Sequence, residues 1–574
     1  MLSIRHKRPI SFLSVIICII LARLCLGSSS SSPYETWPEV SVEEQNAIRS
    51  ERDIQNNITI DQLPYVGVNL QSVLFNNETY EEVSEIDTTT SLNGTDTLNN
   101  FASMLNQGIG SFILDIENKN HTWYILDTNI QVKDFLSTLE NFLDQSNSNL
   151  SANVLLFLLR IHVNSLDDDD SVTENDRTII RDTLNHTTLN YTMTRQLSLE
   201  LSGNERAKSV SNNTQLTNLN LTALIEQNFN TNYIYKPSNL LEDNNLNLST
   251  SILNISSSAT SSLEWPTLEK FLYTKHNRIV ITELTSMLND SLSSYVFPNT
   301  ILHLDRYNST LTCPTNAEEF KNISSIQWRL LEAPFDYNGI QQYMRCGFSP
   351  IITNRFSILN ITEITPLINR GIIWSWKKNE PRLSNSRLLM GKDSMQAYNC
   401  AMLKFTSSNG SAYWQVDNCY STRTMVCKNK FDPFIWTLSK EKHKYFTYYN
   451  DNDDVFCPDN YTFSLPITQL EQRSLDLYLE SLDTPNFNLW INLNSIAVSN
   501  CWLIGDRSYM CPYSRSVSKR NFVSMLVPVV IIAAVLLVCV LYLSLLNVPI
   551  HDNRKNWRRV VNKISKSEME GVPS

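Results

Sequence analysis

Three acidic residues stand near the ends of predicted strands, where they could take part in chemistry. Asp115 and Glu117 close the apolar stretch GIGSFILDIE, residues 108–117, and Glu283 lies near the end of RIVITEL, residues 278–284. Paired carboxylates can bind a metal ion or act as acid and base in a hydrolysis. Carboxylates at strand ends also form purely structural salt bridges. The pattern therefore offers weak candidate catalytic residues and leaves a structural role open.

Histidines and cysteines add no second catalytic or metal site to this pattern. The six histidines that follow residue 27 are scattered along the sequence: His121, His162, His186, His276, His303 and His443. Zinc sites gather such residues at short spacings, and the sequence has neither a C-x-x-C pair nor a histidine cluster. We therefore predict no metal site and no cofactor.

The acidic residues need a scaffold, and the chain up to residue 380 alternates short apolar strands with helices. Continuous apolar runs such as ANVLLFLLRIHV are typical of parallel strands that are covered on both faces. The alternation predicts an α/β fold, a (β/α) barrel or a wound sheet. We expect the fold to begin near residue 58, with helices at 131–144 and 266–273 and strands at 108–117, 152–163, 278–284, 326–331, 349–353 and 371–376.

Composition divides the remaining sequence into segments. Residues 28–56 are polar and rich in Ser, which predicts a loose connector before the barrel of residues 57–380. Inside the barrel, residues 164–263 are rich in Asn, Ser and Thr and predict a long inserted loop. From 381 to 515 cysteines and aromatic residues dominate, which predicts a disulfide-rich, mostly-β module with a helix within 465–482 and a strand at 488–493.

Two apolar stretches predict the relation of the chain to a membrane. Residues 522–546 carry no charge, and a helix of this length crosses a hydrocarbon core of about 30 Å. Residues 1–27 have a basic start and an apolar run, as in a signal peptide, with an uncleaved anchor as the alternative. Together they predict a single-pass type I membrane protein of the secretory pathway, with its N-terminal region lumenal or extracellular and its tail, residues 547–574, cytoplasmic.

The tail is basic and is predicted to form a short amphipathic helix. Such a helix can lie on the lipid bilayer or bind a partner protein. A solvated flank beside the membrane span would explain the same composition, so both interpretations stay open. The candidate contact residues are Trp557, Arg558, Arg559, Lys563 and Lys566.

The cysteines between the two apolar stretches predict four disulfides. The sequence has 11 cysteines, of which Cys18 and Cys25 lie in the signal segment and Cys539 lies in the span. An even number of cysteines in an oxidising compartment favours disulfides, although the sequence does not fix their pairing. The eight remaining cysteines are Cys313, Cys346, Cys400, Cys419, Cys427, Cys457, Cys501 and Cys511.

Sequons and net charge agree with a lumenal glycoprotein. The formal net charge is -11, which argues against an extended surface for nucleic acid, so we predict no direct nucleic-acid partner. The motif N-x-S/T recurs before the span, and occupied sites must lie on the surface. The candidate glycosylation sites are Asn57, Asn77, Asn93, Asn120, Asn149, Asn185, Asn190, Asn212, Asn220, Asn247, Asn254, Asn289, Asn308, Asn322, Asn360, Asn409 and Asn460.

Motifs in the first part of the chain resemble the phosphatidylinositol-phospholipase-C-like barrel. They are LDIE (114–117), ANVLLFLL (152–159), WPTL (265–268) and WSWKKNEP (374–381). The resemblance implies a (β/α) barrel whose active members use a histidine pair as base and acid. The place of the first histidine reads PYVGVNLQS here, residues 64–72. We therefore predict a barrel that lacks phospholipase chemistry.

The second part is similar to a C-type lectin over residues 400–427, where Cys400, Trp414, Cys419 and Cys427 follow one another in the order of that family. Calcium-binding lectins place Asn-Asp after the tryptophan as oxygen ligands, whereas Gln415 and Val416 stand here. Arg382 follows Glu380-Pro381 at the place of an amide. The similarity implies a structural cysteine framework rather than a calcium-dependent sugar site.

Longer motifs resemble the fungal maintenance of telomere capping protein 6 family. They are IDQLPYVG (60–67), IYKPS (234–238), CPDNYTF (457–463), LEQRS (470–474), WINLNSIAVSNCW (490–502) and the tail from residue 552. The resemblance implies a type I membrane glycoprotein linked to telomere capping, without a known catalytic residue. Because a lumenal ectodomain does not reach telomeric DNA, we expect an indirect effect.

Two main hypotheses of function follow from the sequence. In the first, the ectodomain is not an enzyme and binds a glycan, a lipid headgroup or a protein. In the alternative, it is a lumenal phosphodiesterase or glycosidase that uses Asp115, Glu117 and Glu283, which must then converge in one pocket. A third hypothesis gives the active role to the tail alone.

Overall fold

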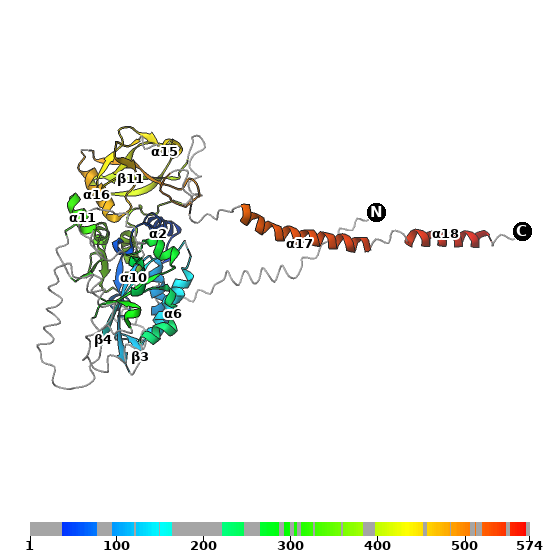
Figure 1. Cartoon of the computed structure of the whole chain (residues 1–574), viewed down its shortest axis with the longest axis horizontal. Helices are drawn as coiled ribbons and strands as arrows, with labels where there is room; N and C mark the ends of the chain where they lie inside the picture. Colours follow the sequence, from blue (N-terminus) through cyan, green and yellow to red (C-terminus); the bar gives the residue numbers. More distant parts are fainter. Residues whose placement is uncertain are drawn as a thin grey trace. The chain divides into compact units, whose positions relative to one another are not determined.

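The structure, a computed structural model, describes residues 37–76, 94–119, 122–148, 150–162, 221–245, 265–285, 292–298, 303–306, 312–324, 328–356, 360–382, 397–451, 456–482, 484–505, 511, 519–546 and 552–569. It divides into two compact units, Met1–Cys511 and Pro512–Ser574. The first unit holds the barrel and the disulfide-rich module, and the second holds the C-terminal helices (Figure 1). The predicted signal peptide lies outside the described residues.

A sheet of parallel strands forms the barrel, as the sequence predicts. Its order is β6-β4-β2-β1-β10-β9-β8, and β5 and β7 also pair in parallel with β6. Only β3, the return strand of a hairpin with β2, runs antiparallel. Within the described residues no pairing joins β7 to β8, so the barrel is open there. The strands are β1 (Gly67–Asn69), β2 (Ser111–Lys119), β3 (Thr122–Ile125), β4 (Leu155–His162), β5 (Ile234–Tyr235), β6 (Ile279–Glu283), β7 (Val296–Phe297), β8 (His303–Arg306), β9 (Arg329–Ala333) and β10 (Ser349–Ile352).

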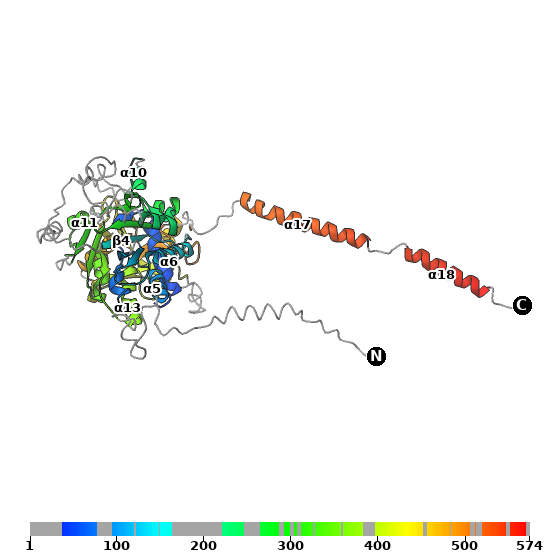
Figure 2. The same ribbon diagram turned by 90° about the horizontal axis from the view of Figure 1, so that it is seen from below.

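Helices cover the outside of this sheet, and Figure 2 shows several of them arranged around the strands. The predicted helix at 131–144 is confirmed as α6 (Val132–Gln145), whose Phe135 and Leu139 pack on the sheet. The predicted helix at 266–273 is confirmed as a helical turn that includes Lys270–Thr274. The other described helices are α3 (Leu70–Val73), α5 (Gly94–Asn106), α10 (Pro237–Asn245), α11 (Ala317–Ser324), α12 (Ile340–Arg345) and α13 (Ile361–Ile372).

The two faces of each strand belong to different hydrophobic clusters. Ile113, Leu156 and Leu330 pack in the barrel interior, together with Val280 and Ile351. Their neighbours in sequence, such as Phe112, Leu155 and Ile281, pack outward against the helices. Because side chains alternate along a strand, this assignment fixes which polar residues at the strand ends point into the barrel.

The module is a second, mixed sheet of order β12-β11-β17-β13-β14. Its strands are β11 (Cys400–Thr406), β12 (Ser411–Asp417), β13 (Thr422–Asn429), β14 (Trp436–Leu438), β15 (His443–Lys444), β16 (Tyr461–Phe463) and β17 (Asn486–Asn494). The helix predicted within 465–482 is α16 (Gln469–Glu480), the strand predicted at 488–493 lies in β17, and α15 (Tyr445–Asp451) is a short second helix. The mostly-β prediction is therefore confirmed.

Four disulfides form, as predicted, and the structure supplies the pairing. Cys313–Cys346 lies in the barrel region, and the other three lie in the module: Cys400–Cys419, Cys427–Cys457 and Cys501–Cys511. Cys539 is the free cysteine among the described residues. These bonds agree with an oxidising compartment.

The connector prediction is wrong for part of residues 28–56. Residues 42–54 form α2 (Val42–Ile54), which begins with a capping box between Ser41 and Glu44. Ala47 and Ile54 are buried in a cluster with Trp374 and Trp376, at the junction of the barrel and the module. Figure 1 shows α2 between these two parts.

Two further predictions need correction. The inserted loop, 164–263, is partly folded, because β5 joins the sheet and the fully buried Asp243 accepts hydrogen bonds from Lys270 (2.8 Å) and Lys275 (2.6 Å). These partners are distant in sequence, which composition cannot reveal. Residues 371–376 are not a strand, because α13 continues through Ile372 and the chain then enters the junction.

The second unit contains two helices. The residues of the predicted span form one long helix, α17 (Lys519–Leu546), whose stretch Leu526–Leu545 is long and apolar enough to cross a membrane. The tail forms α18 (Asp552–Met569), as its pattern predicts. The apolar helix and the disulfides suggest a membrane-anchored protein of the secretory pathway.

Candidate functional site

Charged side chains collect at the carboxyl end of the barrel strands. Asp115 and Glu117 come from β2, Arg160 and His162 from β4, and Glu332 from β9. Each shares the alternation of an interior residue on its strand, so each is placed on the inner face. Because the strands are parallel, these ends meet at one edge of the sheet, the edge where barrel enzymes place their active sites.

Arg160 is the centre of this group. Its Nη2 donates to both carboxylate oxygens of Glu332, at 3.1 and 3.0 Å, and its Nη1 donates to Asp115 Oδ1 at 3.3 Å. Although burial opposes it, the two carboxylates raise the pKa of the Arg160 guanidinium above its ordinary value. Asn69, at the end of β1, donates from Nδ2 to Glu332 at 3.0 Å. One guanidinium thus links three strand ends through charge-assisted hydrogen bonds.

His162 shares Asp115 with Arg160. The His162 Nε2 and Asp115 Oδ1 atoms are 2.8 Å apart. The His162 side chain is 39 % exposed, whereas that of Asp115 is 4 % exposed. A buried carboxylate that orients a more exposed imidazole is an arrangement that can move a proton.

Glu117 has a different environment from Asp115. It pairs with Lys119 and accepts a hydrogen bond from the backbone N–H of Asp127 at 3.2 Å, in the β2–β3 hairpin. These contacts support the structural role that the sequence left open for this residue.

The structure does not bring Glu283 to the other two acidic candidates. On β6, Ile279 and Ile281 face the helices, and Glu283 continues their alternation on the outer face. It accepts a hydrogen bond from Thr285 Oγ1 at 2.8 Å. The convergence of Asp115, Glu117 and Glu283 that the hydrolase hypothesis requires is not found.

Sequence reasoning missed Arg160, His162, Glu332 and Asn69. The signal for the first two was present in ANVLLFLLRIHV, where Arg160 and His162 share the alternation of Leu156 and Leu158. Glu332 and Asn69 offered no local signal, because Glu332 is 172 residues from its partner Arg160 and Asn69 is 263 residues from its partner Glu332. Among the residues that the structure describes, no three His, Cys, Asp or Glu side chains are grouped so as to hold a metal ion.

Residues 380–416 also pair an arginine with a carboxylate. Glu380 pairs with Arg382 at 3.0 Å and accepts from the backbone N–H of Val416 at 3.4 Å. Burial raises the pKa of the Glu380 carboxyl above its ordinary value. The Glu380 carboxylate is therefore already paired with a cationic side chain, which supports a structural role for it.

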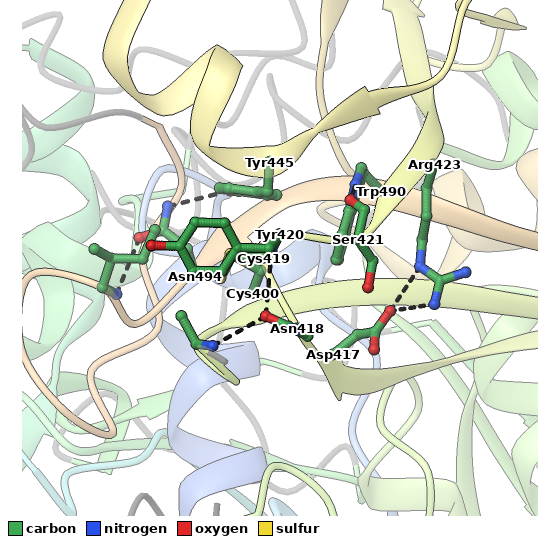
Figure 3. Close-up of a disulfide and its surroundings, with 12 residues drawn as sticks. Cys400, Asp417, Asn418, Cys419, Tyr420, Ser421, Arg423, Tyr445, Trp490 and Asn494 are labelled. Carbon is green, nitrogen blue, oxygen red and sulfur yellow. Dashed lines mark hydrogen bonds and ion pairs between the residues drawn. A yellow bond between two sulfur atoms is a disulfide. The ribbon is translucent and has the colours of Figure 1, made fainter. Parts of the chain in front are cut away.

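The Cys400–Cys419 disulfide joins the start of β11 to the loop after β12, and Figure 3 shows the residues around it. Arg423 donates from Nε to Asp417 at 2.6 Å and lies over the ring of Trp490, with its guanidinium carbon 5.5 Å from the ring centre. Asn418 accepts from the backbone N–H groups of Ala397 and Tyr420. These contacts fix the loop after β12, which supports the predicted structural cysteine framework.

The opposite, amino end of the barrel contains a cavity of about 110 Å³. Its lining includes Glu51 and Arg52 of α2, Gly110 before β2, and Trp374. Burial raises the pKa of Glu51 to about 8, although its carboxylate accepts hydrogen bonds from the N–H (2.9 Å) and Oγ (2.6 Å) of Ser375. This cavity lies at the end of the barrel opposite the Arg160 group, and α2 forms part of its wall.

Comparison with solved structures gives a weak likeness only. A calcium-dependent phosphoinositol-specific phospholipase C from a Gram-negative bacterium, Pseudomonas sp, is 9% identical and has a TM-score of 0.25. The match covers 55% of this chain and 90% of that chain. At this level of similarity no functional residue can be transferred.

Comparison with protein families is much more informative. Residues 38–374 match the family model described as MTC6 partial TIM-barrel domain. Maintenance of telomere capping protein 6 of Saccharomyces cerevisiae (strain YJM789) is 38% identical over 541 residues, covering 94% of this chain and 93% of the relative. The protein of the same name from Zygosaccharomyces rouxii is 36% identical and covers 94% of both chains. The chain therefore belongs to the maintenance of telomere capping protein 6 family.

Proposed function

We propose that this protein is a type I membrane glycoprotein whose barrel binds a hydroxyl-rich ligand at the Arg160 group without chemical turnover. The observation that carries the proposal is at the centre of the Arg160 group, where one partly exposed guanidinium pairs with the buried carboxylates of Asp115 and Glu332. Carboxylates fixed in this way remain good acceptors for hydroxyl groups, and guanidinium is a good donor. A glycan and the inositol headgroup of a lipid share this polyol chemistry.

Two buried polar atoms at this end support a ligand in the barrel mouth. Arg160 Nε has no hydrogen-bond partner among the described residues, nor has Thr353 Oγ1 just after β10. Buried polar atoms are rarely left without partners in native proteins. Because neither atom is accessible to solvent, a polyol in the barrel mouth would provide oxygens for both once neighbouring side chains move aside.

The hydrogen-bond partners of the titratable groups support a site that binds its ligand without cleaving it. Acid–base cleavage of a phosphodiester or glycoside needs two groups with separate roles. Asp115 is held by Arg160 and His162, Glu332 by Arg160 and Asn69, and Glu283 lies on the outer face. Among the described histidines, His162 is the one in this group, and His121 lies outside the described residues.

The test uses the ectodomain, residues 28–511, because the first compact unit ends at Cys511. Arrays of phosphoinositides, glycosylphosphatidylinositols and cell-wall glycans would be screened for binding and for product formation. We expect binding without product, and loss of binding in Arg160→Met. A matched control is Arg423→Met, which removes an arginine of similar exposure from the module, at 22% against 17%. Binding that survives in Arg160→Met would refute the proposed site.

One observation favours the hydrolase alternative: the His162 Nε2 and Asp115 Oδ1 atoms are 2.8 Å apart. Turnover of a phosphodiester or glycoside in the same screen, abolished by Asp115→Asn, would replace binding by catalysis as the function of the group.

The lumenal orientation has its own test. The sequons at Asn57, Asn322, Asn360 and Asn460 are exposed, as glycosylation requires. We expect an enzyme that removes N-linked glycans to lower the apparent mass of the protein from cells. Protease added outside sealed microsomes should then remove only the tail.

We further propose that any role in telomere capping is indirect. The relatives carry that name, but the disulfides of this chain and its net charge of -11 favour neither a nuclear compartment nor a nucleic-acid surface. Retention of the capping phenotype by a protein with an altered Arg160 group would separate ligand binding from that role.

A further inference from the structure

The tail helix α18 carries an apolar face that the described residues of its own unit leave exposed. Trp557, Val560, Val561 and Ile564 are exposed by 67%, 48%, 52% and 52%. At 3.6 residues per turn their spacing places them within an arc of about 100° on one face of the helix. A stripe of large exposed apolar side chains marks a surface that contacts a membrane or a partner.

The rest of α18 is basic. Within Asp552–Met569 the sequence has six basic and two acidic residues, whereas the whole chain has a net charge of -11. Lys555, Arg559 and Lys566 fall opposite the apolar stripe on a helical projection, and Arg558 and Lys563 fall beside it. An apolar stripe with a basic remainder fits the surface of an anionic bilayer.

The chain itself restricts where α18 can go. Helix α17 ends at Leu546 and α18 begins at Asp552. The five residues between them extend to about 20 Å at most, at roughly 3.5 Å per residue. The bilayer that holds α17 is therefore always within reach, which raises its effective concentration at the stripe.

We propose that α18 lies in the headgroup region of an anionic leaflet, with its stripe toward the acyl chains and its basic residues among the lipid phosphates. The proposed type I orientation enters only in identifying this leaflet as the cytoplasmic one. A protein partner for the same stripe is the competing outcome of the test.

The experiment uses the full-length chain in vesicles, with a nitroxide spin label on the tail. Cys18→Ser, Cys25→Ser and Cys539→Ser remove the three cysteines that form none of the four disulfides, and the eight disulfide cysteines do not react. A single new cysteine replaces either Val561, on the stripe, or its neighbour Asn562, on the polar face. The vesicles contain phosphatidylcholine, with or without phosphatidylserine.

In vesicles with phosphatidylserine we expect the label at 561 to lie about 5–10 Å below the phosphates and the label at 562 to stay in water. Replacing Arg558, Arg559 and Lys563 by Gln should release the label at 561. Equal water exposure at 561 and 562 would overturn the proposal, as would immersion that is the same in neutral vesicles. A tail immobilised only after cytosol is added would indicate a protein partner instead.

This result does not depend on orientation in the cell, because both leaflets of the vesicles have the same composition. Failure of the lipid contact is therefore distinguishable from failure of the type I proposal, which the microsome experiment tests separately.

Discussion

The two ends of the barrel use charged side chains in opposite ways. At the amino end, Glu51 of α2 accepts a hydrogen bond from the backbone N–H of Ser375, and Arg52 donates one to the backbone carbonyl of Ala152. Arg345 pairs with Asp476 of the module at 2.9 Å. At the carboxyl end, Arg160, Asp115, Glu332 and His162 contact one another, and His162 is partly exposed. The amino end therefore links the barrel to the module, while the carboxyl end pairs its groups with one another on the inner face and leaves His162 partly exposed. The difference indicates where a ligand can bind, and the following experiments test it.

The largest expected effect is on stability, from the amino end. Arg345→Met leaves Asp476 buried without its cation, in a place where burial already raises the pKa of Asp476 to about 6. We expect the free energy of unfolding of the ectodomain to fall by about 3–5 kcal/mol, since breaking a buried pair leaves an uncompensated charge. Urea denaturation measures it. Arg382→Met, which breaks a pair with a 58% exposed arginine, is the control and should cost less than about 1 kcal/mol. Equal losses would contradict the comparison.

The second effect is a dependence of stability on pH that arises at Glu51. Its pKa rises from 4.5 to about 8 in the folded protein, so between these values the folded state binds the extra proton. Stability from this group is therefore present at low pH and is lost as the pH rises toward 8, by up to a few kcal/mol. Denaturation at pH 5 and pH 8 should show this loss in the wild type and a smaller one in Glu51→Gln. An unchanged slope in Glu51→Gln would rule out Glu51 as its source.

The third effect separates binding from stability at the carboxyl end. Arg160→Met removes the shared partner of Asp115 and Glu332, and we expect binding of the ligand found in the screen to weaken at least about tenfold, or about 1.4 kcal/mol. The loss of stability should be smaller than in Arg345→Met, because Arg160 is partly exposed. Titration calorimetry and denaturation of the same samples check both. If Arg345→Met weakens binding per folded molecule as much as Arg160→Met does, the two ends are not functionally distinct.

The smallest effect is expected from His162→Ala. His162 is 39% exposed and Arg160 still pairs with Asp115, so the free energy of unfolding should change by less than about 1 kcal/mol. A ligand that contacts His162 should also bind the variant more weakly than the wild type, which titration calorimetry measures. The same affinity in both proteins would exclude the imidazole from the site.

The sequence predicted β2, β4, β6, β9 and β10 because they are largely apolar runs, which a sheet covered on both faces requires. The prediction missed β5, β7 and β8, which are only two to four residues long. Because apolar residues fill both faces of these strands, the sequence did not show which face of β6 carries Glu283. In IVITE, apolar residues occupy both faces of β6, so the alternation could not be assigned before the interior was known. The sequence also did not show that Arg160 would link several strand ends, because its partners Asp115 and Glu332 come from β2 and β9.

Helix α2 shows a different kind of miss. Its capping box, Ser41-x-x-Glu44, was legible in the sequence, but the Ser-rich composition before it favoured a loose connector. What holds α2 in place lies far along the chain: Ser375 bonds Glu51, and Trp376 Nε1 donates to Ser50 Oγ at 2.8 Å. Local sequence signals can identify such a helix, but only the tertiary structure shows that it packs at the junction of the barrel and the module.

The position of α2 also has a consequence for biosynthesis. Its Ala47 and Ile54 are buried with Leu489 and Trp502 of the module, so α2 is completed by residues made more than 400 positions later. At roughly 5–20 residues per second this delay lasts tens of seconds. During that time α2 and the end of the barrel expose apolar surface to chaperones. A chain that terminates after the barrel would never bury this surface, and quality control would retain it as an unfinished protein.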